Sequence, residues 1–372
     1  MINRRDFFKL SGLLILGTSL KDVSGDIPGE RIIFTGELGN KLFGFDRKFF
    51  TFFMDLNRLK IEKINSPINS HSFVQNPVKK NQVVGIEKWG YGMALFDSNT
   101  LRLKKHIKLD HPKQFVGHGD FVSDGSLFYV SVSNYNDPYL TTVGKGFIHV
   151  YETKNYSLVD QFETFGFEPH QISFFNDDKY LLVLNPGFGK YFEPPFLKGK
   201  GPIVDFYPSI TVIERKTKTL IKEILYEDKD VTMAHLTKMG EDEFFFVGGK
   251  KLVDDTWENK AFNFTLDGGL KSCETSGMGM KGLPLLSASY APNIKTLAAT
   301  SPRSDALLLW KDGILKTLDV KQPNGVSLTR DGKKFVISQL NGISFVDISE
   351  KKIVKQIKIP FYESSGGHSL II

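Results

Sequence analysis

Residues 166–184 read GFEPHQISFFNDDKYLLVL, and this stretch decides the fold. His170 opens a short apolar segment, Asp177 and Asp178 supply a tight acidic turn, and a second apolar run follows from Tyr180 to Leu184. Short runs rich in Val, Ile, Phe and Tyr that are bounded by Gly, Asn and Asp are typical of β-strands and not of helices. The stretch therefore predicts two strands joined by a tight turn.

The same unit recurs along the whole chain. Its first position is a histidine in five copies and another residue in two, namely His71, His118, His170, His235, Ser287, Asn324 and His368. These seven positions lie 47, 52, 65, 52, 37 and 44 residues apart. A period of roughly 40–50 residues with several strands per unit is the signature of a β-propeller.

A second marker recurs in step with the first. It is a strand that runs into a charged residue and a polar turn, and it is found at Leu42–Asp46, Met93–Asp97, Phe147–Glu152, Ile210–Glu214, Phe262–Asp267, Ala306–Trp310 and Ile343–Asp347. Seven copies of each marker predict an all-β chain that forms a single seven-bladed β-propeller.

The ends of the chain indicate how such a ring would close. His368–Ile372 is one more copy of the opening strand, and its partners must then come from the N-terminal side, at Ile32–Thr35 and Leu42–Phe45. Pairing the two ends would leave no free strand edge at the seam. We therefore expect residues 26–372 to form one closed domain, and the alternative is an unclosed array of β-sandwich units.

The N-terminus resembles a twin-arginine export signal. Asn3-Arg4-Arg5-Asp6-Phe7-Phe8-Lys9 precedes an apolar stretch, Leu10–Leu20, that is too short for a membrane-spanning helix of roughly 20 residues. We expect residues 1–25 to be this signal and the mature protein to be periplasmic, with no transmembrane span. The alternatives are an uncleaved membrane anchor and an ordinary basic start.

Cysteine count and charge exclude several classes of function. Cys273 is the only cysteine, so the chain has no internal disulfide and no two-cysteine haem attachment site. The net charge of +6 falls to +4 without residues 1–25, because four Lys or Arg and two Asp or Glu are lost. This small and dispersed charge does not predict a nucleic-acid partner.

The histidine register predicts a site on the propeller axis. The innermost strand of every blade starts on one face beside the central channel, so histidines at the starts of five such strands should converge there. The long segments Asn134–Gly146 and Asn185–Pro208 would cover this face. Neutral imidazole is a common ligand of copper, zinc and iron. The predicted metal ligands are His71, His118, His170, His235 and His368.

Four further residues are candidates for holding these histidines or binding a ligand. Asp120 and Glu168 neighbour two of the histidines, Asn324 occupies the histidine position of its copy, and Arg303 lies in a loop from which it can reach an anion. The alternative is a purely structural ring, in which each imidazole bonds to a neighbouring blade without a metal. No G-x-S-x-G elbow, H-E-x-x-H pair or glycine-rich phosphate loop is present.

With these motifs in view, the chain resembles the bacterial family called domain of unknown function 1513. The resemblance rests on Gly117-His118-Gly119 with Ser123-Asp124-Gly125, on Gly166–His170, on Ala234-His235-Leu236 and on Thr300–Arg303. The chain has Ala234 where the family pattern has an arginine, and its last histidine stands in the context Gly-Gly-His-Ser. The resemblance implies an exported seven-bladed propeller with no settled activity. It also implies partners of the imelysin-like or di-haem peroxidase-like kind, hence a role in periplasmic iron or copper handling.

Three functions remain open at this point. The first is a periplasmic propeller that binds copper, iron or a small ligand at the axial histidines. The second is a lactonase-like or quinone-dependent propeller enzyme, in which histidines act as acids or bases. The third is a docking platform for another envelope protein, without chemistry of its own.

Overall fold

The computed structural model describes most of the chain after residue 28. The described residues are 29–38, 48–134, 145–186, 207–226, 228, 230–252, 256–275, 280–281, 284–359, 363–364 and 367–372. The expected signal 1–25, the segment Leu42–Asp46 and most of the two expected covering segments lie outside them.

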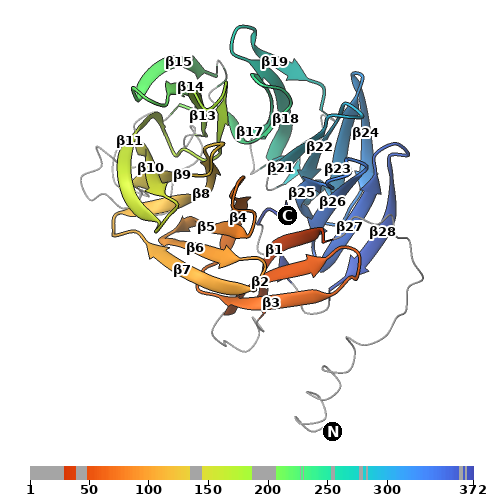
Figure 1. Ribbon diagram of the computed structural model, residues 1–372. Coiled ribbons are helices and arrows are strands. Elements are labelled where there is room, and N and C mark those ends of the chain that lie inside the picture. Colours follow the sequence, from red (N-terminus) through yellow and green to blue (C-terminus); the bar gives the residue numbers. More distant parts are fainter. Residues whose placement is uncertain are drawn as a thin grey trace.

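The described part of the chain is all-β apart from one short 3₁₀ helix, η3 (Pro302–Ser304). Its antiparallel sheets lie around a common centre, as in a propeller (Figure 1). Strand bounds in the first half of the chain are β1 (Arg31–Leu38), β2 (Lys48–Asp55), β3 (Ile61–Ser66), β4 (Ser70–Gln75), β5 (Gln82–Gly90), β6 (Gly92–Asp97), β7 (Arg102–Lys108), β8 (Lys113–Phe121), β9 (Leu127–Asn134), β10 (Lys145–Glu152), β11 (Ser157–Phe167), β12 (Ile172–Phe175), β13 (Tyr180–Asn185), β14 (Ser209–Glu214) and β15 (Thr219–Leu225).

The second half of the chain continues with further four-stranded antiparallel sheets. Its strands are β16 (Val231–Lys238), β17 (Glu243–Lys251), β18 (Thr256–Thr265), β19 (Gly269–Cys273), β20 (Met280–Lys281), β21 (Ser287–Ala291), β22 (Thr296–Ser301), β23 (Ala306–Lys311), β24 (Ile314–Asp319), β25 (Pro323–Leu328), β26 (Lys334–Gln339), β27 (Gly342–Asp347), β28 (Lys352–Lys358), β29 (Glu363–Ser364) and β30 (Leu370–Ile371). The groups β12–β15, β21–β24 and β25–β28 are complete four-stranded sheets, and β20 adds to β18 in the sheet β16–β19.

Burial differs systematically between the strands of one sheet. The middle strands are buried on both faces, as in β6, where all six residues are buried. The outermost strands alternate between exposed and partly buried residues, as in β28, whose sequence KIVKQIK places Lys352 and Lys358 on the exposed side. Strands that read as continuous apolar runs pack between two neighbouring sheets, whereas strands with alternating polarity face water on one side.

The hydrophobic core consists of clusters between neighbouring strand groups. One cluster joins β5, β6 and β8–β10, and another joins β12–β14 to β16–β18. A further cluster joins β26 and β27 near the C-terminus to β1 and β2 near the N-terminus, through Ile343 and Phe345 against Phe34 and Phe52. Side chains of both chain ends therefore share one core.

The terminal strands also pair through their backbones. Ile371 and Leu370 of β30 lie opposite Ile32 and Ile33 of β1, and the N–H of Ile372 donates to the carbonyl of Arg31 over 2.8 Å. The expected partner Ile32–Thr35 is thus observed. The next strand outward is β2, which pairs with β1 along its whole length. We expected Leu42–Phe45 in this place, whereas the aromatic run Phe49–Met54 fills it.

The strand β5 extends beyond its own sheet. Its last residues pair with β8 of the following group, where Lys88 lies opposite Val116 and Gly90 lies opposite Phe115. This pairing joins β4–β7 and β8–β11 into one eight-stranded sheet. It also carries Lys88 towards the centre of the molecule.

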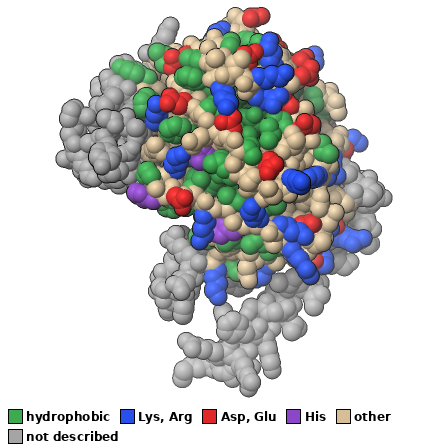
Figure 2. Space-filling model, turned by 60° about the vertical axis from the view of Figure 1, so that its left-hand side comes forward, with side chains coloured by type: hydrophobic (Ala, Val, Ile, Leu, Met, Phe, Trp, Pro, Cys, Tyr) green, Lys and Arg blue, Asp and Glu red, His purple; other side chains and the backbone are tan. Residues whose placement is uncertain are grey.

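The surface shows no single charged patch on the face drawn in Figure 2, where basic and acidic side chains are interspersed. Among the described residues no helix is long and apolar enough to cross a membrane.

The terminal pairing leads to a test on Ile372, which is 5% exposed and packs in a cluster with Ile33 and Phe73. We expect Ile372→Asp to lower the free energy of unfolding by about 3 kcal/mol, because it places a charge in an apolar cluster. The matched control is Val354→Asp on β28, where the side chain is 43% exposed and the change should cost under about 0.5 kcal/mol. Urea unfolding followed by circular dichroism measures both. Equal effects of the two changes would show that the terminal strand contributes nothing to stability.

Candidate metal centre

Five histidines come together from five different strand groups. His71 lies in β4, His118 in β8 and His235 in β16, whereas His170 and His368 precede β12 and β30 by two residues. The strands β4, β8, β12 and β16 are each the first of their group along the chain, and β30 pairs with β1. The two that Figure 1 labels, β4 and β8, lie next to the centre. The residues that the sequence register predicted to share one place do so.

Irregular strand pairing turns several of these positions inward. The register shifts between Ser70 and Ser72, so that His71 has no direct partner on β5, and a longer shift on β8 spans Phe115 to Gly119 around His118. A β-bulge adds an unpaired residue, bends the strand and re-aims its side chain. On β25 the same irregularity falls on Asn324, between Pro323 and Gly325.

Gly117 makes room for one of the rings. Its φ of +106° belongs to the left-handed half of backbone space that side chains with a Cβ rarely adopt. A Cβ on this residue would also lie 2.5 Å from Cδ2 of His71. The glycine before His118 is therefore needed for both the backbone path and the packing of the neighbouring imidazole.

Backbone hydrogen bonds tie the histidine segments to one another. The hydroxyl of Ser131 lies 2.9 Å from the carbonyl oxygen of His118 and 2.8 Å from that of His170, and can donate to either. The N–H of His368 donates to the carbonyl of His71 over 2.6 Å. The backbones of these histidine segments are thus held together by hydrogen bonds between neighbouring groups.

The imidazole rings are packed against each other. Ring centroids are 4.5 Å apart for His235 and His368, 4.6 Å for His118 and His170, and 4.7 Å for His71 and His368. One nitrogen from each of His71, His118, His235 and His368 can be chosen so that all four lie within 4.8 Å of one another. Four ligand atoms at this spacing can surround a single metal ion after small side-chain adjustments.

The nitrogen atoms of this cluster lack protein partners. The buried Nε2 atoms of His71, His118 and His368 and both ring nitrogens of His235 have no hydrogen bond in the described part of the chain. Buried polar groups in folded proteins are nearly always hydrogen-bonded, so a cluster of several unpaired ring nitrogens needs an explanation. Coordination of a metal ion or a small ligand would satisfy them together.

The protonation state of the cluster suits metal coordination. Burial lowers the pKa of His71, His118, His170 and His235 well below the usual value, and charges on neighbouring imidazoles and on Lys88 lower it further. For His368, burial and then Lys88 lower the pKa to about 3. The imidazoles are neutral at neutral pH, and the neutral form is the one that binds metals.

Lys88 is part of the site and was not predicted from the sequence. Its Nζ lies 3.5 Å from Nε2 of His170 and 4.8 Å from the centroid of the Trp89 ring. Burial lowers the pKa of Lys88 to about 8, against the opposing charge of Glu168. This contact distinguishes His170, which lies outside the four-histidine group, from the other four. In the sequence, Lys88 follows the apolar run Val83–Ile86 with only Glu87 between them, and this continuity is the one signal that the strand extends to it.

Two of the four additional candidates lie close to the cluster or link its strands. Glu168 is buried and has a positive φ of 52°. Its carboxylate accepts a hydrogen bond from Nε1 of Trp89 over 3.1 Å and interacts with the charge of Lys88. The carboxylate of Asp120 accepts the N–H of Phe121 and, over 3.1 Å, that of Phe174, and so links β8 to β12. Burial raises the pKa of Asp120 to about 7.

The other two candidates, Asn324 and Arg303, lie on β25 and in η3. The carbonyl of Asn324 accepts a hydrogen bond from the hydroxyl of Thr300 over 3.1 Å. Arg303 is exposed in η3, between β22 and β23. A role of either side chain at the histidine cluster stays a prediction.

A cavity of about 300 Å³ adjoins the histidines. His118, His235 and His368 line it together with serines of the inner strands, namely Ser72, Ser287, Ser289, Ser327 and Ser369. Ser287 occupies the histidine position of its copy, so the register continues around the centre with a smaller polar side chain. The cavity gives a small molecule room beside the imidazoles.

The lowered pKa values lead to a test of the metal-free protein. Below pH 6.5 the histidines of the unfolded chain become protonated, whereas the buried imidazoles of the folded protein stay neutral. The free energy of unfolding therefore falls as the pH drops from 6.5 towards the pKa of about 3 of His368. Each such histidine contributes about 1.4 kcal/mol per pH unit in this window. His368→Gln should flatten the slope by about this amount. Urea unfolding at several pH values measures the slopes, and an unchanged slope for His368→Gln would contradict a buried neutral imidazole.

Comparison with known proteins finds a similar fold in a solved structure and a family whose function is unknown. The solved structure of hydrazine synthase from Kuenenia stuttgartiensis superimposes with a TM-score of 0.60 at 12% sequence identity, over 84% of this chain and 93% of that one. This similarity concerns the fold alone. No curated protein matches the chain. A family model described as "Protein of unknown function (DUF1513)" matches residues 64–362, and the chain belongs to this family.

Proposed function

We propose that this protein binds one transition-metal ion, copper or iron, at His71, His118, His235 and His368. The observation that carries the proposal is the set of buried, unpartnered imidazole nitrogens within 4.8 Å of one another. All-imidazole sites suit iron, nickel, copper and zinc, and the affinity of a given site rises from iron through nickel to copper and is lower again for zinc. His170 lies beside the four rings and is the fifth ligand candidate.

The missing hydrogen bonds favour a ligand site over a structural ring. A structural histidine would be expected to bond to a neighbouring strand with at least one ring nitrogen, since each buried unpaired polar group costs about 1–3 kcal/mol. His235 has neither nitrogen bonded, although it is 1% exposed. A bound metal ion would offset this cost.

The scaffold that we propose is a seven-bladed propeller whose ring is closed by β1 and β30. Support comes from the terminal strand pairing and from the cluster that joins β26–β27 to β1–β2. A closed ring has no free edge and holds side chains of separate blades at fixed distances. Such a scaffold presents ligands in position before the metal arrives.

The surroundings of the site support a binding role more than acid–base catalysis. A general base works best when its pKa is near the working pH, whereas burial lowers the pKa of all five clustered histidines far from neutrality. The lactonase-like or quinone-dependent enzyme is therefore the second candidate. A docking platform without chemistry would not explain why unpaired imidazoles gather at the centre.

The proposed setting is the periplasm. The twin-arginine sequence in residues 1–25 supports export of the domain formed by residues 26–372. Imelysin-like and di-haem peroxidase-like proteins are the proposed partners, through the family resemblance. In this setting the protein would take part in iron or copper handling.

Metal titration of protein purified without a histidine tag tests the proposal. We expect one Cu(II) or Fe(II) ion per chain, and His118→Ala should weaken binding by about a hundredfold, because one of four ligands is lost. His106→Ala is the control, since this histidine lies on β7 outside the cluster, and it should keep the affinity of the unaltered protein. Calorimetry with atomic-absorption analysis measures both. A chain that binds none of these ions, or that binds them equally well after His118→Ala, would refute the metal site.

A further inference from the structure

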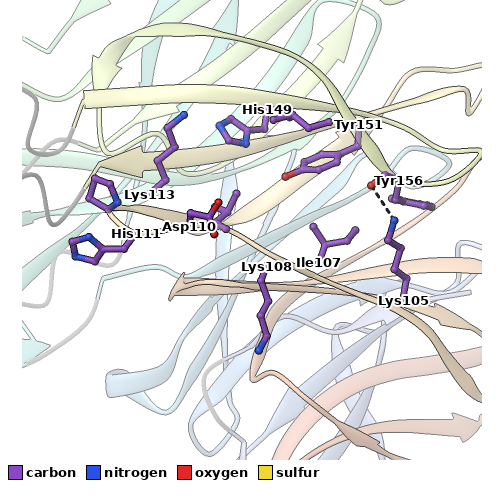
Figure 3. Close-up of a pocket in the computed structure, with 12 residues that line it drawn as sticks. Lys105, Ile107, Lys108, Asp110, His111, Lys113, His149, Tyr151 and Tyr156 are labelled. Carbon is purple, nitrogen blue, oxygen red and sulfur yellow. Dashed lines mark hydrogen bonds between the residues drawn. The ribbon is translucent and has the colours of Figure 1, made fainter.

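The central cavity lacks the charged side chains that line a second cavity of the protein. The second cavity, of about 460 Å³, lies away from the histidine cluster and shares no lining residue with the central one. Figure 3 shows His149 and Tyr151 of β10 and Ile107 of β7 around it, and Asp110 and three lysines line it as well. No Asp, Glu, Lys or Arg is among the described residues that line the central cavity. The charge of a ligand in the central cavity must therefore be balanced by something other than the side chains that line it.

A metal ion at the proposed centre would supply a positive charge there. Four neutral imidazoles bring no negative charge, so a divalent ion that they bind keeps its full charge. Lys88 adds to the positive potential, since its charge contributes to lowering the pKa of all five clustered histidines, and Glu168 offsets at most the charge of Lys88. A buried charge without a counter-charge is costly. We therefore expect the centre to take up a small anion together with the metal ion.

The central cavity gives such an anion access to the centre. Three of the four proposed metal ligands, His118, His235 and His368, line it, whereas His71 is not among its lining residues. A molecule in the cavity would thus meet the ion on the side of these three rings. Metal sites that act on small molecules keep one coordination position for them beside the protein ligands. The volume of about 300 Å³ leaves room for a small organic anion.

Hydroxyl donors for the anion lie on β21. Ser287 and Ser289 alternate along this strand, and both side chains line the cavity. The Oγ of Ser287 accepts the N–H of Val326 over 3.2 Å, and its own proton has no acceptor among the described residues. The hydroxyl of Ser289 makes no hydrogen bond within the same part of the chain. Both hydroxyls can therefore donate to a ligand.

The rest of the lining favours an organic anion over an inorganic one. Apolar side chains alternate with the serines around the cavity, among them Ala288, Val326, Leu328 and Leu370. An alkyl group would pack against these side chains, whereas phosphate or sulfate would place further charged oxygens beside them. A carboxylate has one charge, shared by two oxygens, and can carry such an alkyl group.

We propose that the central cavity binds a small aliphatic carboxylate as an additional ligand of the metal ion. One carboxylate oxygen would coordinate the ion, the hydroxyl of Ser287 would donate to the other oxygen, and the alkyl group would lie against the apolar lining. Ser287 occupies the histidine position of its copy, so its hydroxyl is the one nearest in register to the metal ligands. This inference rests on the proposed metal site and names the class of molecule that the site would take.

Titration of the copper-loaded full chain with acetate tests the proposal, with binding measured by calorimetry and by the electron paramagnetic resonance spectrum of Cu(II). We expect one acetate per copper ion and a change in the spectrum, because the carboxylate enters the coordination shell. The metal-free chain should bind acetate at least tenfold more weakly. Acetamide, which has the same shape without the charge, should also bind at least tenfold more weakly than acetate.

A serine variant tests the hydroxyl donor. Ser287→Ala should weaken acetate binding by about tenfold, because a hydrogen bond to a charged group is lost, while the copper affinity stays within about twofold. Ser287→Thr keeps the hydroxyl and should bind acetate more tightly than Ser287→Ala. Ser272→Ala, at an exposed position on β19, is the matched control and should leave both affinities within about twofold. Thermal unfolding verifies that each variant keeps its fold.

The outcomes separate this inference from the metal site on which it rests. A chain that binds no copper would overturn both. A copper-loaded chain that does not bind acetate, or that binds acetamide or inorganic phosphate more tightly than acetate, would overturn the carboxylate alone. Acetate affinity that is the same in Ser287→Ala as in the unaltered chain would overturn the role of Ser287.

Discussion

The exclusion of water from a group of imidazole rings is the constraint on which this molecule's centre depends. Five rings, with centroids 4.5–6.1 Å apart in nine of their ten pairs, cannot carry positive charge together in a buried space, so their pKa values fall and they stay neutral. A neutral imidazole still has a donor and an acceptor to satisfy. Because five of these ring nitrogens have no hydrogen-bond partner among the described residues, the centre is suited to an ion or small molecule that bonds to them.

The propeller-like arrangement explains how such a centre can be built. Each inner strand contributes one side chain, and the bulges at His71 and around His118 turn those side chains towards the middle. The stabilising apolar surface lies elsewhere, in the clusters between neighbouring groups. Changes at the centre therefore alter binding more than folding, and proteins with this fold can differ widely in function.

The sequence predicted the strands and the meeting of the histidines, because both follow from a repeat that can be counted along the chain. It did not predict features that depend on how far a strand continues in space. Lys88 reaches His170 only because β5 runs past its own sheet and pairs with β8. Likewise, His149 lies outside the histidine register, and the absence of partners for its ring becomes visible only when β7 and β10 are placed side by side.

X-ray absorption spectroscopy on metal-loaded protein without a tag tests the central claim most directly. We expect a first shell of four nitrogen atoms at about 2.0 Å, with the multiple scattering of imidazole rings. Replacing His235 with alanine should reduce the number of imidazoles in this shell by one. A shell made of oxygen atoms alone, or one unchanged by the His235 replacement, would contradict the account.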